Sequence, residues 1–141
     1  AAVLMMSEKR ANSLGLTPLA RIVSSVAVGD DPHLMLTGPI PATRKVLERT
    51  GMRMDQIDAV EVNEAFAPVP LAWLDSFPEV DPARLNPRGG AIALGHPLGA
   101  SGVRLMTTLI NHLRQTHGRY GLQTMCEAGG MANATIIERL G

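Results

Sequence analysis

Short apolar runs alternate along the chain with segments of helical periodicity, and this alternation constrains the fold more than any other feature. The strongest helical signal covers 100–117 and ends at Gly118. Its apolar positions recur at steps of three and four residues: Val103, Met106, Ile110 and Leu113. Alternation of this kind is typical of an α/β domain, in which helices pack on a sheet.

Five apolar runs rich in branched residues predict strands. They lie at 1–6, 19–28, 58–62, 122–126 and 134–137. The last two runs flank a Gly-Gly pair and predict a hairpin that closes the domain. The sheet is therefore expected to be mixed, with helices on both faces and the order β-α-β-α-β-α-β-β.

Punctuating residues predict the helices between these strands. Ser7 is a candidate N-cap for a helix over 8–14, which Gly15 ends, and a helix over 41–50 ends at Gly51. A further helix follows Asn63. Because Pro68 and Pro70 fall within it, we expect a kink or an irregular first turn there.

The charge balance and length favour one globular domain. The chain has 141 residues, with 13 Lys and Arg against 13 Asp and Glu, so its formal net charge is zero. A neutral chain is not typical of nucleic-acid binders. With 45% hydrophobic and 18% charged residues, the composition is globular and unlike that of disordered chains.

The cysteine and histidine content argues against a metal site. One cysteine excludes an internal disulfide and a Cys-rich zinc site. His112 and His117 share the predicted helix, but five residues turn about 140° around its axis, so they do not face one ion. We expect no metal.

No targeting or membrane segment is recognisable. No apolar run approaches the roughly 20 residues of a membrane helix, and residues 1–6 lack the basic region of a secretory signal. We expect a cytoplasmic protein, or an organelle-matrix protein whose transit peptide has been removed.

The most unusual segment is 86–102, which contains five glycines and His96. Gly95 leaves one side of His96 uncrowded, and Pro97 favours an extended backbone at the histidine. An imidazole held on an open loop suits a general base or an oxyanion donor. The alternative is a glycine-rich turn with an incidental histidine. The glycines lack the spacing of the dinucleotide-binding and P-loop motifs, so nucleotide binding is disfavoured.

Two further segments place polar side chains at the ends of predicted strands. Cys126 ends a strand beside a Gly-Gly turn, where a thiol can reach a cleft; alternatively, it is a small buried core residue. Asn63 stands where a strand meets a helix, at the edge where open α/β sheets build their sites; alternatively, it is an N-cap. Phe66, three residues after Asn63, is either part of this candidate site or a residue of the core. A Cys, a His and an Asn can converge on one acyl-transfer site.

Together these segments resemble the C-terminal signatures of the thiolase family, which comprises the acetyl-CoA acetyltransferases and 3-ketoacyl-CoA thiolases. The matching sequences are Asn-Glu-Ala-Phe-Ala at 63–67, Gly-His-Pro-Leu-Gly-Ala-Ser-Gly at 95–102 and Cys-Glu-Ala-Gly-Gly at 126–130. The resemblance covers nearly the whole chain and implies a thiolase-like C-terminal half-domain. It also implies Claisen-type cleavage or formation of a carbon–carbon bond on coenzyme A thioesters through an acyl-cysteine.

The resemblance gives each matching residue an expected role. His96 resembles the histidine that activates the nucleophilic cysteine and helps to hold the thioester oxyanion. Asn63 resembles the asparagine that fixes a catalytic water, and Cys126 resembles the second, acid/base cysteine. The remaining binding positions line the pantetheine tunnel or the oxyanion sites: Ala65, Phe66, Gly95 and Ala128. Ala128 departs from the glycine of many members, although its N–H is retained.

The nucleophilic cysteine and the coenzyme A-gripping loop domain of the family are not in these 141 residues. We therefore expect the chain to need an N-terminal thiolase half, to be inactive alone and to expose apolar surface. The resemblance implies a homodimer or homotetramer of the complete protein. It also implies coenzyme A and acyl-CoA as substrates, with no further cofactor. The alternative is a non-catalytic thiolase-like module for acyl-CoA binding or dimerisation.

Overall fold

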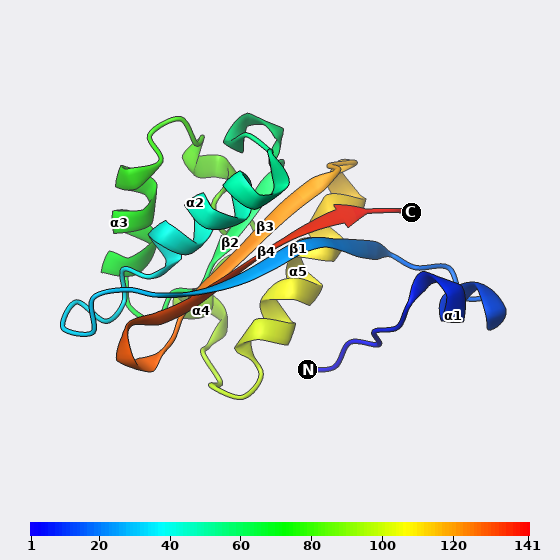
Figure 1. Ribbon diagram of the computed structural model, residues 1–141, viewed down its shortest axis with the longest axis horizontal. Helices are drawn as coiled ribbons and strands as arrows, with labels where there is room; N and C mark the ends of the chain where they lie inside the picture. The colour runs from blue at the N-terminus through cyan, green and yellow to red at the C-terminus, as the bar shows by residue number, and fades with distance from the viewer.

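Four of the five predicted strands form one mixed sheet in the computed structural model, which describes all 141 residues (Figure 1). The strands are β1 (Ala20–Gly29), β2 (Ala59–Val62), β3 (Tyr120–Cys126) and β4 (Met131–Arg139), in the order β1-β4-β3-β2. β2 and β3 are parallel, whereas β4 is antiparallel to both of its neighbours. The predicted hairpin between the last two strands is confirmed.

Helices cover both faces of this sheet, as expected. The chain forms five α-helices: α1 (Glu8–Ser13), α2 (Pro39–Thr50), α3 (Pro68–Ser76), α4 (Ala91–Leu94) and α5 (Ser101–Thr116). α2 and α3 lie on one face, and α5 lies on the other (Figure 1). The sequence analysis did not predict α4, a single turn inside the glycine-rich segment.

Most helix ends follow the local sequence, although α2 begins at Pro39, two residues before the predicted start at Pro41. The Ser7 hydroxyl caps α1 by accepting from the Arg10 N–H, and Gly51 ends α2 in the left-handed conformation. The prediction that Gly118 ends α5 is wrong, because His117 takes the left-handed position with φ of 59°. Gly118 instead lies against Leu113, where a Cβ would come within 2.9 Å of that side chain.

The predicted strand over residues 1–6 is wrong. These residues are exposed and belong to neither a strand nor a helix, and Figure 1 shows them apart from the sheet. An apolar run indicates that a segment can be buried, but a strand also needs a neighbouring strand that pairs with its backbone N–H and C=O groups. Residues 1–6 pair with no strand of the sheet. The observed order therefore begins α-β rather than β-α-β.

The two prolines shape α3 without kinking it. Pro68 is the first helical residue and Pro70 falls in the first turn, where the missing N–H groups have no intrahelical partner to lose. The helix therefore begins at Pro68, five residues later than Asn63. This leaves residues 63–67 as an irregular segment between β2 and α3.

The core has two parts, one on each side of the sheet. The larger part packs α2 and α3 on the sheet around the fully buried Trp73. The smaller part holds α5 through Leu109 and Leu113. The buried stripe of α5 runs through Leu105, Leu109 and Leu113, whereas three of the four positions that the periodicity picked are only half-buried. Gly121 lets α5 approach β3, since a Cβ there would lie 2.9 Å from Leu109.

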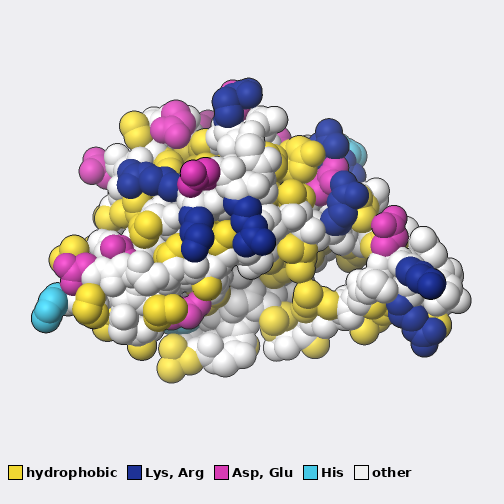
Figure 2. All heavy atoms as spheres, viewed as in Figure 1, with side chains coloured by type: hydrophobic (Ala, Val, Ile, Leu, Met, Phe, Trp, Pro, Cys, Tyr) yellow, Lys and Arg dark blue, Asp and Glu magenta, His cyan; other side chains and the backbone are white.

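Apolar side chains are exposed along the side of the molecule that carries the N-terminal segment and the loop before α5 (Figures 1 and 2). Leu4 and Leu98 are 80% and 88% exposed. The expected exposed apolar surface is thus confirmed. None of the helices is both long and apolar enough to span a membrane.

Replacing Leu109 by alanine tests the smaller core. The side chain is fully buried between α5 and the sheet, so Leu109→Ala should lower the free energy of unfolding by about 2–5 kcal/mol. Urea unfolding followed by circular dichroism measures this loss. The matched control is Leu98→Ala, at an exposed position, which should change stability by less than about 0.5 kcal/mol. Equal effects of the two substitutions would contradict the assigned packing.

Candidate functional site

Asn63 and His96 meet at the carboxyl end of β2. The Asn63 N–H donates to the Thr124 carbonyl at 3.0 Å, which continues the parallel pairing with β3 one residue beyond the strand. The Asn63 side chain is buried, and its Nδ2 lies 3.4 Å from Nε2 of His96. Asn63 is not a helix cap, because the residue at the cap position of α3 is Ala67.

Ser101 orients the His96 ring from the first turn of α5. Its hydroxyl donates to the Pro97 carbonyl at 3.0 Å and lies 2.6 Å from Nδ1 of His96. The tautomer with its proton on Nδ1 satisfies both bonds, because the hydroxyl can then donate to Pro97 while it accepts from the ring. In that tautomer Nε2 holds a lone pair toward Asn63. The ring thus presents Nε2 at the meeting point of the two elements.

The sequence analysis did not single out Ser101, although it lies inside the quoted glycine-rich segment. The available signal is local: a hydroxyl one helical turn after a Pro carbonyl and five residues after the histidine. Gly95, at φ of 97°, makes the turn that brings His96 to this position. A side chain at residue 95 would strain that backbone.

Cys126 lies at the same edge of the sheet but is not bonded to the other two residues. It ends β3, the parallel neighbour of β2, and packs into the larger core. Burial raises the pKa of the thiol, and the nearby Glu127 charge adds to this shift against an opposing backbone hydrogen bond. No hydrogen bond joins the thiol to His96 or Asn63. Its burial agrees with the alternative of a core cysteine, and the acid/base role stays a prediction.

The turn after Cys126 begins with Ala128, which is exposed. Gly129 and Gly130 follow with φ of 75° and 78°. A Cβ at Gly130 would press on the Asp30 carbonyl, so this turn packs closely against the loop after β1. Glu127 is turned outward and accepts a hydrogen bond from Asn133. The Ala128 N–H thus lies in an open turn beside the end of β3.

Ala65 and Phe66 continue from Asn63 toward α3. Phe66 is 63% exposed, so its core-packing alternative is wrong. Ala65 is half-buried against the larger core. An open hollow of about 440 Å³ lies nearby between α3 and the glycine-rich segment; Glu64, Leu71, Gly90 and Ile92 are among the residues that line it. Ala65 and Phe66 do not line this hollow themselves.

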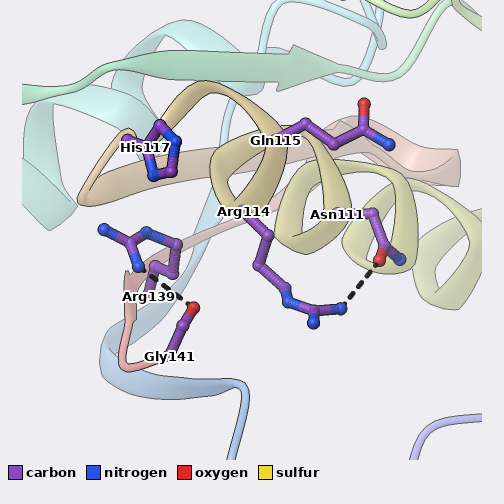
Figure 3. A pocket seen from close by; sticks show the side chains of 6 residues that line it. All are labelled: Asn111, Arg114, Gln115, His117, Arg139 and Gly141. Atoms are coloured by element: carbon purple, nitrogen blue, oxygen red, sulfur yellow. Dashed lines mark hydrogen bonds between the residues drawn. The ribbon is translucent and has the colours of Figure 1, made fainter.

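A second hollow, of about 360 Å³, lies at the opposite end of α5 (Figure 3). Its lining is polar: Asn111, Arg114, Gln115, His117, Arg139 and Gly141. Arg139 donates to the Gly141 carbonyl at 3.0 Å. None of the predicted site residues lines this hollow. No cluster of three or more His, Cys, Asp or Glu side chains is arranged to hold a metal ion.

A buried acid lies two residues before Asn63. Glu61 is fully buried on the α5 face of β2, and its carboxylate accepts no hydrogen bond from the chain. Burial raises the pKa of Glu61 to about 8, although the positive charge of Arg104 lowers it. The guanidinium of Arg104 is also buried without a hydrogen-bond acceptor. Two buried polar side chains thus lie between β2 and α5, and Glu61 precedes Asn63 by two residues.

Comparisons with known proteins agree in one family. The family model described as the thiolase C-terminal domain matches residues 16–139. The chain is 60% identical over 139 residues to the steroid 3-ketoacyl-CoA thiolase FadA6 of Mycobacterium tuberculosis, covering 99% of this chain and 34% of that protein. It is 50% identical over 140 residues to an acetyl-CoA acetyltransferase of Shinella zoogloeoides, covering 99% and 36%.

A solved structure supports the same grouping. The crystal structure of the Bacillus anthracis acetyl-CoA acetyltransferase superimposes with a TM-score of 0.91 at 40% identity, covering 96% of this chain and 34% of that one. The chain spans about a third of the length of the curated relatives that it matches. The thiolase-like α/β fold expected from the sequence is confirmed.

The buried carboxyl of Glu61 predicts a pH-dependent stability. Its pKa is about 8 in the folded chain and about 4.5 when exposed, so the folded state binds more protons between these values. The contribution of Glu61 to stability is complete below about pH 4.5 and is lost as the pH rises through about 8. Urea unfolding at several pH values should show this loss. In Glu61→Gln, which is neutral at every pH, the decline should be smaller; an unchanged decline would contradict the assignment.

The raised pKa of Cys126 predicts slow alkylation. Because thiolate is the reactive form, iodoacetamide should modify the folded chain at neutral pH several-fold more slowly than the same chain in urea. The alkylation rate of the folded chain should increase only at pH values above those at which a free thiol ionises. As this is the sole cysteine, intact mass reports the site directly. Equal rates in the folded and unfolded chains would show that the thiol is neither buried nor perturbed.

Proposed function

Because the chain belongs to the family of thiolase C-terminal domains, we propose that it supplies part of the active site of an acyltransferase, a 3-ketoacyl-CoA thiolase. The reaction is Claisen-type cleavage or condensation of coenzyme A thioesters through an acyl-cysteine. The observation that carries the proposal is the hydrogen-bonded series Asn63–His96–Ser101 at the carboxyl end of β2. Cys126 ends the adjacent parallel strand.

His96 is assigned the role of base toward the nucleophilic thiol. Its Nε2 lone pair accepts the thiol proton while Ser101 holds the protonated Nδ1. The resulting Nε2–H and the Asn63 amide then face the same point, where both can donate to a thioester oxyanion, directly or through a water that Asn63 holds. Two donors in a water-poor site stabilise a negative charge more strongly than they do in bulk solvent.

Cys126 is assigned the second proton transfer. In the cleavage direction the nucleophilic cysteine attacks the 3-keto carbon and the bond between C2 and C3 breaks. The C2 enolate then takes a proton from the Cys126 thiol. A second coenzyme A thiol attacks the acyl-cysteine and returns a proton to the Cys126 thiolate. The released nucleophilic cysteine takes back the proton that His96 holds, and both steps together restore the site. The raised pKa of Cys126 supports this role, since a proton donor must be protonated at neutral pH.

The remaining assignments follow from the resemblance to the thiolase family. Phe66 and Ala65 are placed along the pantetheine tunnel, Gly95 beside the first oxyanion and the Ala128 N–H at the second. The substrates are coenzyme A and acyl-CoA, without a further cofactor or metal. The nucleophilic cysteine belongs to a longer polypeptide, because Cys126 is the single thiol here and the chain matches about a third of its relatives. The complete enzyme is assigned a homodimeric or homotetrameric state and a cytoplasmic or organelle-matrix location.

Thiolysis by the full-length protein that contains this chain tests the proposal. With acetoacetyl-CoA and coenzyme A, His96→Ala and Cys126→Ala should each lower kcat at least about 100-fold, because each removes a proton-transfer group. Asn63→Ala should lower kcat through loss of an oxyanion donor. Glu79→Gln, an exposed position on the same domain, is the matched control and should retain activity.

Mass spectrometry of the same protein separates the outcomes. An acyl group on a cysteine outside residues 1–141 should accumulate when the acyl-enzyme is trapped. Normal turnover in His96→Ala or Cys126→Ala would reject the site assignment. Absence of both turnover and acyl-enzyme in the wild type, with acyl-CoA still bound, would favour a non-catalytic binding module instead.

A further inference from the structure

We propose that Glu64 is a positioning residue, whose carboxylate clamps the glycine-rich segment to the end of β2 and thereby sets the distance at which His96 meets Asn63. The kinetic part of its test rests on the proposed function, whereas the geometry and the chemical part do not. The contacts of Glu64 lead outward from β2 to the segment that carries His96.

Both carboxylate oxygens of Glu64 accept hydrogen bonds from that segment. Oε1 accepts from Nδ2 of Asn86, and Oε2 accepts from the backbone N–H of Ile92, each at 2.9 Å. Ile92 is the second residue of α4, where an N–H has no intrahelical partner. A charged acceptor makes these bonds stronger than neutral ones. Glu64 thus satisfies the start of a one-turn helix that could not hold itself together.

Asn86, which donates to Glu64, is itself bonded to the end of β2. Its Oδ1 accepts from the Val62 N–H and its Nδ2 donates to the Val62 carbonyl, both at 2.9 Å, so the amide pairs with the last residue of β2 as a neighbouring strand would. To do so Asn86 adopts a left-handed backbone with φ of 46°. The same Nδ2 also reaches Glu64. The segment is therefore anchored to β2 before α4 begins.

Asn63 and Glu64, which are consecutive in the chain, contact the start of α4 and the residue that lies two positions after its end. Glu64 binds the N–H of Ile92, and Asn63 contacts the ring of His96 four residues later. Between these two points the segment has little other support, because Ile92 and Leu94 are 66% and 54% exposed. Without the Glu64 bond, the position of His96 would depend on Asn63, on the start of α5 and on the more distant anchors at Asn86 and Arg88.

The contact between Glu64 and Ile92 requires a glycine at position 90. A Cβ at residue 90 would overlap the Glu64 carboxylate, so only glycine lets the carboxylate reach the Ile92 N–H. The backbone of Gly90 has φ of −102°, which any residue can adopt, so the requirement comes from the carboxylate and not from the turn. Glu64 and Gly90 therefore act as one unit, although they are 26 positions apart in the sequence.

The first experiment measures the exposure of the His96 ring. Diethyl pyrocarbonate modifies free imidazole nitrogens, and peptide mass spectrometry of the full-length protein reads each histidine separately. Glu64→Gln places an amide NH₂ opposite one of two donors and so loses at least one bond. His96 should then react about 5-fold faster or more, since about 1 kcal/mol of lost contact gives a factor of that order. His117, an exposed residue at the end of α5 whose ring makes no hydrogen bond to the segment, should react as before.

The second experiment measures turnover of the same variants. Glu64→Gln and Gly90→Ala should each lower kcat for thiolysis about 10- to 100-fold, with KM changed less than about 3-fold, because displacement of a catalytic group by about 1 Å costs this much. The double variant Glu64→Gln with Gly90→Ala should lose little more than the worse single variant, since both remove one clamp. Glu79→Gln and Gly29→Ala are the matched controls; a Cβ at Gly29 meets only Met131, at 3.8 Å.

The outcomes are distinguishable. Unchanged His96 reactivity in Glu64→Gln would overturn the proposal, as would a parallel rise at His117, because that rise would mean general loosening of the fold. Fully additive losses in the double variant would also overturn it. If the wild type catalyses no thiolysis while His96 reactivity rises selectively in both single variants, the proposed function fails and the clamp stands.

Discussion

The parallel pairing of β2 with β3 is the interaction on which the rest of the site depends. It aligns Val62 with Thr124, so the residues that follow the two strands emerge at one edge of the sheet. A parallel pair cannot be joined by a tight turn, and here the chain between the two strands crosses both faces through α3 and α5. The glycine-rich segment is the part of this crossover that returns to the edge. The same constraint that orders the strands therefore brings His96 back to Asn63.

Two buried polar side chains near that edge are costly for a domain of this size. Glu61 and Arg104 are buried between β2 and α5, and neither has a hydrogen-bond partner within the chain. Buried polar groups without a hydrogen-bond partner cost free energy compared with apolar residues of similar volume. Departures from good core packing concentrate where function requires them, and Glu61 lies only two residues before the proposed oxyanion donor Asn63.

Much of the fold could be predicted because its signals are local. Ser7, Gly51 and the Gly-Gly hairpin act within a few residues, and the structure confirms all three. The strand over residues 1–6 failed because pairing depends on a neighbour and not on apolarity. α4 was missed because one turn has no periodicity to detect, and its stability comes from Glu64, far away in the sequence. The sequence placed Asn63 and His96 at element ends, but only the tertiary structure shows that they touch.

Separate parts of the chain set the orientation of the His96 ring and its distance from Asn63. Ring orientation is local: the hydroxyl of Ser101 holds Nδ1 and is itself held by the Pro97 carbonyl, all within six residues. A neutral hydroxyl suffices for this, because the task is to fix the tautomer and the plane of the ring. The distance to Asn63 is not local, because it depends on where the whole segment lies against β2. A rigid short-range device and a long-range tether are therefore both needed, and loss of the tether would leave a correctly oriented imidazole in the wrong place.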